Sequence, residues 1–173
     1  MTASTAVFLL LRASHVLLAS LWVGATAFAT FFLFPAVADA GPSAGPVMGA
    51  LVRRRLPVFM ASVGGTAVLT GVYLYYRFTG GFDPALSGTR AAMVFGTGGI
   101  LGILALIVGG VIVSRNVKKM SELGARLASA SPDDRAPLAS QMAVHRQRAM
   151  SGSRIVIVLQ MIAVVLMAIG HYV

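Results

Sequence analysis

The sequence predicts an all-α integral membrane protein, a four-helix bundle, and two observations carry this prediction. First, 57% of the 173 residues are hydrophobic and only 11% are charged, with a mean hydropathy of +0.85. A soluble domain carries roughly a quarter of charged residues, so this chain has too few polar groups to cover a soluble surface. Second, four apolar stretches approach the roughly 20 residues that a helix needs to cross a bilayer. At this length we expect a single domain, residues 1–173.

The four stretches set the expected order of the spans, residues 13–34, 56–76, 91–113 and 155–173. An apolar segment from Thr5 precedes the first span and is interrupted by Arg12, so the whole helix should tilt or protrude from the membrane. The first residues lack a basic segment, and the apolar run continues past Ala25-Thr26-Ala27. We therefore expect this span to be retained rather than cleaved as a signal peptide.

The basic residues predict the orientation of the chain. Eleven of the 14 Lys and Arg residues lie in the loops after spans one and three, and the other three are Arg12, Arg77 and Arg90. Because cytoplasmic loops carry the excess of Lys and Arg, we expect these two loops in the cytoplasm and both termini outside. The net charge of +9 then belongs to the membrane surface rather than to a nucleic-acid interface. The expected location is the cell inner (plasma) membrane, crossed several times, with the lipid bilayer as partner.

The third loop predicts a cytoplasmic helical hairpin that extends spans three and four. Ser131-Pro132-Asp133-Asp134 is typical of a helix start, with a capping serine, proline in the first turn and acidic residues near the positive end of the dipole. Apolar stripes at helical spacing flank this start. Their members are Val113, Val117, Met120, Gly124 and Leu127 before it, and Leu138, Met142, His145 and Ala149 after it. We expect His145 itself to be solvated among neighbouring arginines.

Small residues indicate close packing of the spans, as at Gly98 and Gly102, Ser20 and Gly24, and the pair Gly64-Gly65. Packing within the bundle explains most of this signal, and a homodimer remains the alternative.

His15 and His171 are the residues that point to chemistry. Ionisable side chains inside spans are costly and commonly functional, and these two should lie in the same outer leaflet at comparable depth. Two imidazoles on facing helices can supply both axial ligands of b-type haem, and Arg12 and Arg90 could pair with its propionates. The absence of cysteine excludes thiolate metal sites and covalently attached c-type haem. Each histidine could equally just hydrogen-bond a carbonyl or lie among the headgroups.

A copper site would use overlapping residues. Met167 precedes His171 by four positions and should share its helical face, and thioether and imidazole groups suit Cu(I). His15 would complete a three-ligand set. No carboxylate lies within a span, and no phosphate-binding glycine motif occurs. The sequence identifies no catalytic residue, and whether the protein is an enzyme stays open.

The stretch from Arg12 to Gly24 carries a family resemblance. His15, then Trp22 seven residues later and Gly24 two residues after that, resembles the first helix of CopD-like copper-resistance membrane proteins and HemJ-type protoporphyrinogen oxidases. The resemblance implies a histidine-bearing helical bundle that handles haem or copper, with His15 and Trp22 matching the family residues. The first expectation is haem b held between His15 and His171 near the outer face, for electron transfer or oxidation. The alternatives are copper handling by His15, Met167 and His171, and service as a non-catalytic subunit of a larger membrane complex.

Overall fold

The computed structural model describes residues 3–173, which form helices and connecting turns and include no strand. Four continuous helices, Thr5–Ala40, Leu56–Phe78, Arg90–Ala128 and Pro132–Ile169, are long and apolar enough to cross a membrane. The prediction of an all-helical chain with four long apolar helices is therefore confirmed. All four predicted stretches lie mainly in these helices, although the last helix ends at Ile169 and leaves His171 in the C-terminal turn.

Two of the long helices contain π-helical turns. Helix α1 (Ala3–Phe28) passes through the π-helical segment η1 (Ala29–Leu33) into α2 (Phe34–Ala40). Helix α6 (Arg90–Val108) passes through a second one, η3 (Gly109–Val113), into α7 (Ser114–Ala128). The other two long helices are α4 (Leu56–Phe78) and α8 (Pro132–Ile169), and α5 (Pro84–Ser87) is a single turn. Single π-helical turns inside α-helices are often found at functional sites.

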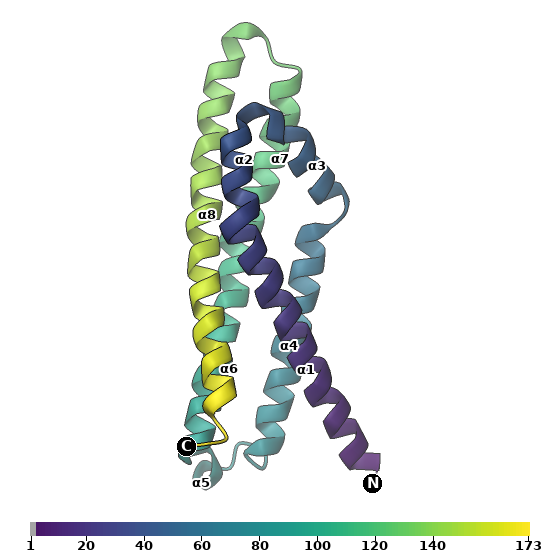
Figure 1. Cartoon of the computed structure of the whole chain (residues 1–173), viewed down its shortest axis with the longest axis vertical. Coiled ribbons are helices and arrows are strands. Elements are labelled where there is room, and N and C mark those ends of the chain that lie inside the picture. Colours follow the sequence, from purple (N-terminus) through teal and green to yellow (C-terminus); the bar gives the residue numbers. More distant parts are fainter. Residues whose placement is uncertain (1–2) are drawn as a thin grey trace.

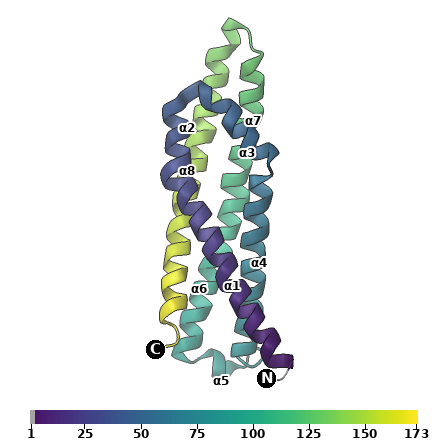
Figure 2. The ribbon, with the colours of Figure 1, turned by 45° about the vertical axis from the view of Figure 1, so that its right-hand side comes forward.

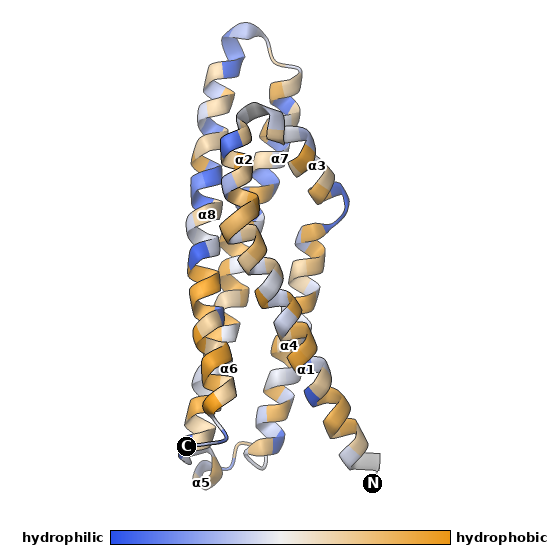
Figure 3. Ribbon diagram, viewed as in Figure 1, coloured by the Kyte–Doolittle hydropathy of each residue, from blue (hydrophilic) through white to orange (hydrophobic). Residues whose placement is uncertain are grey.

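The bundle consists of two antiparallel pairs, α1 with α4 and α6 with α8. Both termini lie at one end, here called the terminal end, and the turn between α7 and α8 forms the opposite hairpin end (Figure 1). Helix α1 is inclined to the other helices and diverges from α8 towards the terminal end in both views (Figures 1 and 2). Apolar residues dominate the terminal half, whereas charged residues gather towards the hairpin end (Figure 3).

The expected helical hairpin is present. Ser131 caps α8 by accepting a hydrogen bond from the Asp134 backbone N–H, and Pro132 opens the helix. Helix α7 packs along the first half of α8, and the predicted stripes supply their contact. Met120 and Ala149 are buried in a cluster to which Val113, Val117 and Met142 also belong. At about 1.5 Å per residue, the 38 residues of α8 span about 57 Å, well beyond a hydrocarbon core of about 30 Å.

The first loop is more structured than its sequence predicts. It forms α2, a short 3-10 turn (Gly41–Ala44) and α3 (Gly45–Arg53), and these pack on α7 and α8. Phe34, Val37 and Met48 are buried there against Met120 and Ala149. Gly41 turns the chain with a φ of +57°, a region that favours glycine. This loop lacks a long apolar run, so its burial depends on a partner surface that only the folded hairpin supplies.

Candidate functional site

His15 lies on α1 and its half-buried ring packs against α4. Its Nδ1 is 2.8 Å from the Ala67 carbonyl oxygen and 3.3 Å from Thr70 Oγ1. A carbonyl oxygen only accepts, so the hydrogen bond to Ala67 requires the ring proton to be on Nδ1. The Thr70 hydroxyl donates its proton to the carbonyls of Thr66 and Ala67 in its own helix, so Thr70 Oγ1 can only accept from His15. In the neutral ring, Nε2 then carries the lone pair.

Two glycines on α4 admit the aromatic rings of α1. A Cβ on Gly71 would lie 2.8 Å from His15 Cε1, and a Cβ on Gly64 would lie 2.6 Å from Trp22 Cε2. His15 and Trp22 are seven residues apart, as are Gly64 and Gly71, and the two helices are antiparallel. Each ring therefore meets one glycine in register. The matched spacing of seven was a signal in the sequence, but the pairing of α1 with α4 was needed to interpret it.

His171 lies in the turn after α8, where its contacts come from α1 and α6. Arg12 Nη2 is 3.2 Å from His171 Nε2, and since a guanidinium only donates, Nε2 is the acceptor. The ring also meets Phe95 edge-on, with centroids 4.9 Å apart. Phe95 in turn contacts Gly170, where a Cβ would lie 2.5 Å from Phe95 Cε1. Arg12, one helical turn before His15, thus brings His171 to the level of the first histidine.

The remaining predicted site residues, Arg90 and Met167, make no recorded contact with either histidine. Arg90 is exposed at the first position of α6, at the terminal end. Met167 packs on α6, where a Cβ on Gly98 would lie 3.0 Å from its Cε. The two histidines are engaged by different helices, His15 by α4 and His171 by α1 and α6. Among residues 3–173, no group of three His, Cys, Asp or Glu side chains could hold a metal ion.

The expectation that His145 is solvated is wrong. Its ring is half-buried between α7 and α8, and its Nδ1 lies 2.7 Å from Asn116 Oδ1. The Asn116 amide donates to the Ile112 carbonyl in the π-helical segment η3, so Oδ1 is the acceptor for His145. The packing of α7 against α8 partly covers this ring, although arginines surround it in the sequence.

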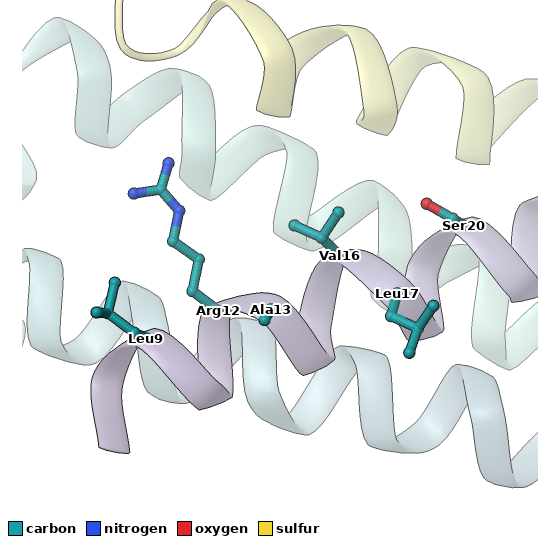
Figure 4. Close-up of a pocket in the computed structure, with 6 residues that line it drawn as sticks. All are labelled: Leu9, Arg12, Ala13, Val16, Leu17 and Ser20. Carbon is teal, nitrogen blue, oxygen red and sulfur yellow. The ribbon is translucent and has the colours of Figure 1, made fainter. Parts of the chain in front are cut away.

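An open groove follows the face of α1 beside Arg12. Its volume is about 550 Å³, and its lining is largely apolar. Figure 4 shows Arg12 extending from α1 towards α8 across this groove, and the labelled side chains all come from α1. The lining residues are Leu9, Arg12, Ala13, Val16, Leu17 and Ser20.

A line of buried polar side chains between α1 and α8 was not anticipated from the sequence. Thr26 and Thr30 donate to the carbonyls of Trp22 and Thr26, and Thr30 Oγ1 lies 2.6 Å from Ser153 Oγ. Gln160, two turns beyond Ser153 on α8, is only 2% exposed. Such uncharged groups do not stand out in a sequence, because Ser, Thr and Gln are tolerated in spans wherever a partner is at hand.

Comparison of the chain with family models, with curated proteins and with solved structures finds no match.

Proposed function

We propose that this chain is an integral membrane redox protein that binds b-type haem at its terminal end, where His15 would hold the haem. The hydrogen bond from His15 Nδ1–H to the Ala67 carbonyl carries the proposal. Histidines that bind metals commonly donate their other ring N–H to a backbone carbonyl, which fixes the tautomer and orients the ring. The contact with Gly71 further restricts the ring and supports a prearranged ligand.

His171 is the second histidine that would hold the haem. Its Nε2 accepts a hydrogen bond from Arg12, so binding through this atom would require Arg12 to move away. The Arg12 guanidinium would then pair with a propionate, whose carboxylate it matches in charge and geometry. Arg90, exposed at the same end, is the candidate for the second propionate. The bound iron would supply one-electron transfer, while the protein sets its ligands and surroundings.

The two alternatives suggested by the sequence have less support. Copper handling by His15, Met167 and His171 would need the Met167 thioether, but the end of this side chain packs on Gly98. A subunit role would need a partner surface, and lipid contact already explains the apolar side chains that the long helices expose, such as Leu17, Leu69 and Val165.

Visible absorption spectroscopy tests the proposal. The protein is expressed with added haem precursor, purified in detergent, and measured oxidised and dithionite-reduced, with His15→Ala, His171→Ala and His145→Ala variants. We expect a Soret band with sharp reduced α and β bands, lost in His15→Ala, shifted or weakened in His171→Ala and unchanged in the matched control His145→Ala. A flat spectrum of the wild-type protein under adequate haem supply overturns the proposal, and metal analysis of the same sample then reports on copper.

A further inference from the structure

Gln160 is a buried polar side chain without a partner. Its exposed fraction is 2%, and neither Nε2 nor Oε1 has a hydrogen-bond partner within the described part of the chain. The residue lies inside the predicted fourth span, where bulk water cannot satisfy it. Burial of an unpaired amide is strongly unfavourable in an apolar medium, so an amide at this position indicates a bound polar group.

Ser153 is the nearest buried polar residue on the same face of α8, two helical turns before Gln160, and the apolar Val156 lies between them. Gln160, Val156 and Ser153 follow one another at spacings of four and three, so they share one face of α8. Ser153 meets Thr30 on this face, and Thr30 continues to Thr26. Among the residues whose side-chain burial the structure describes, five polar side chains are buried, and four of them lie on the first long helix or on α8: Thr26, Thr30, Ser153 and Gln160.

Two π-helical segments lie beside the Thr30–Ser153 contact. Thr30 belongs to the π-helical segment η1, and Gly152 packs against Ile112 and Val113 of the other π-helical segment, η3. The two π-helical segments therefore meet α8 at adjacent residues, Gly152 and Ser153.

The amide of Gln160 defines the chemistry of its partner. Oε1 needs a donor and Nε2 needs an acceptor, so the bound group must do both. The side chains packed near Val156 are apolar, including Trp22, Val63 and Ala105, so a charged ligand would lack a counter-charge. The group must also be small, because Gln160 is enclosed by packed helices. Water is the small neutral molecule that meets these requirements, and buried waters typically make about three hydrogen bonds.

We propose that Gln160 binds internal water in the core of the bundle. The site is separate from the haem proposal, since Gln160 is not a proposed haem ligand. It would place water inside the bundle at membrane depth.

Water-edited solid-state NMR tests this proposal on the unsubstituted side chain. The full chain is labelled with ¹⁵N-glutamine and reconstituted in bilayers with deuterated acyl chains. The sequence has three glutamines, and Gln141 and Gln147 are exposed on the hairpin, so they serve as internal controls. Gln141→Glu and Gln147→Glu variants remove the control signals one at a time and thereby assign the side-chain signal of Gln160.

We expect polarisation from water to reach the Gln160 amide with an initial rate no more than about fivefold below that of the two surface glutamines, because a bound water is in direct contact with it. A slower build-up, which indicates relay through protein protons alone, overturns the proposal.

Discussion

The hydroxyl oxygens of Thr30 and Ser153 lie 2.6 Å apart and join the π-helical segment of the first long helix to α8. Thr30 also donates to the Thr26 carbonyl at 2.7 Å, so Ser153 supplies the proton in the contact between the two hydroxyls. This contact connects residues 123 positions apart in the chain and lies where α1 comes close to α8. It is the basis of the first prediction.

Replacement of Thr30 by Val should destabilise the bundle. Hydrogen bonds between membrane helices contribute about 0.6 kcal/mol on average and up to about 1.7 kcal/mol. We therefore expect the substitution to lower the free energy of unfolding in detergent by about 0.6 to 1.7 kcal/mol. Thr97→Val is the matched control, because the exposed Thr97 hydroxyl donates only to the Met93 carbonyl of its own helix. A double-mutant cycle with Ser153→Ala measures the coupling, and a coupling energy of zero contradicts the assigned contact.

Gly64→Ala should destabilise the bundle, whereas Gly65→Ala should not. A Cβ on Gly64 would meet the Trp22 ring at 2.6 Å, whereas a Cβ on Gly65 meets nothing within 4 Å. Overpacking of this kind lowers the free energy of unfolding by about 1–3 kcal/mol. Gly65→Ala should be neutral or should stabilise the helix by up to about 1 kcal/mol through helix propensity. Thermal unfolding of the two variants compares them directly, and equal midpoints would disprove the ring-on-glycine contact.

Gly71→Ala should disturb His15 while the fold is kept. The new Cβ would come within 2.8 Å of His15 Cε1, so the ring must turn away and lose its bond to Ala67. We expect the ¹⁵N signal of the protonated His15 Nδ1 to shift, and haem affinity to fall by about tenfold or more, which is about 1.4 kcal/mol. Gly102→Ala, with nothing within 4 Å of its Cβ, is the control. An unchanged His15 signal in Gly71→Ala would contradict the prediction, and this readout holds whether or not haem binds.

Single cysteines can test the predicted orientation, because the natural chain has none. Ala85→Cys lies at the terminal end and Ser129→Cys near the turn of the hairpin, both at exposed positions. We expect a membrane-impermeant thiol reagent to label Ala85→Cys in intact cells, and to label Ser129→Cys only after permeabilisation, since basic loops stay in the cytoplasm. The reverse labelling pattern would show that the chain has the opposite topology.

The sequence by itself determined the helical class, the four apolar helices and the hairpin with its cap at Ser131. These features depend on composition, apolar run length and local capping, which are properties of neighbouring residues. It also singled out His15, His171 and Arg12, because ionisable groups are conspicuous in apolar runs.

Only the tertiary structure decided which side chains meet. It placed His15 against Ala67 and Gly71, His171 against Arg12 and Phe95, and the half-buried His145 against Asn116. It also folded the first loop onto α7 and brought Thr30 to Ser153. These outcomes depend on helix pairing and axial register, and on the small residues that allow close approach. Hydropathy can specify that a helix crosses the membrane, but not which neighbour each of its faces will contact.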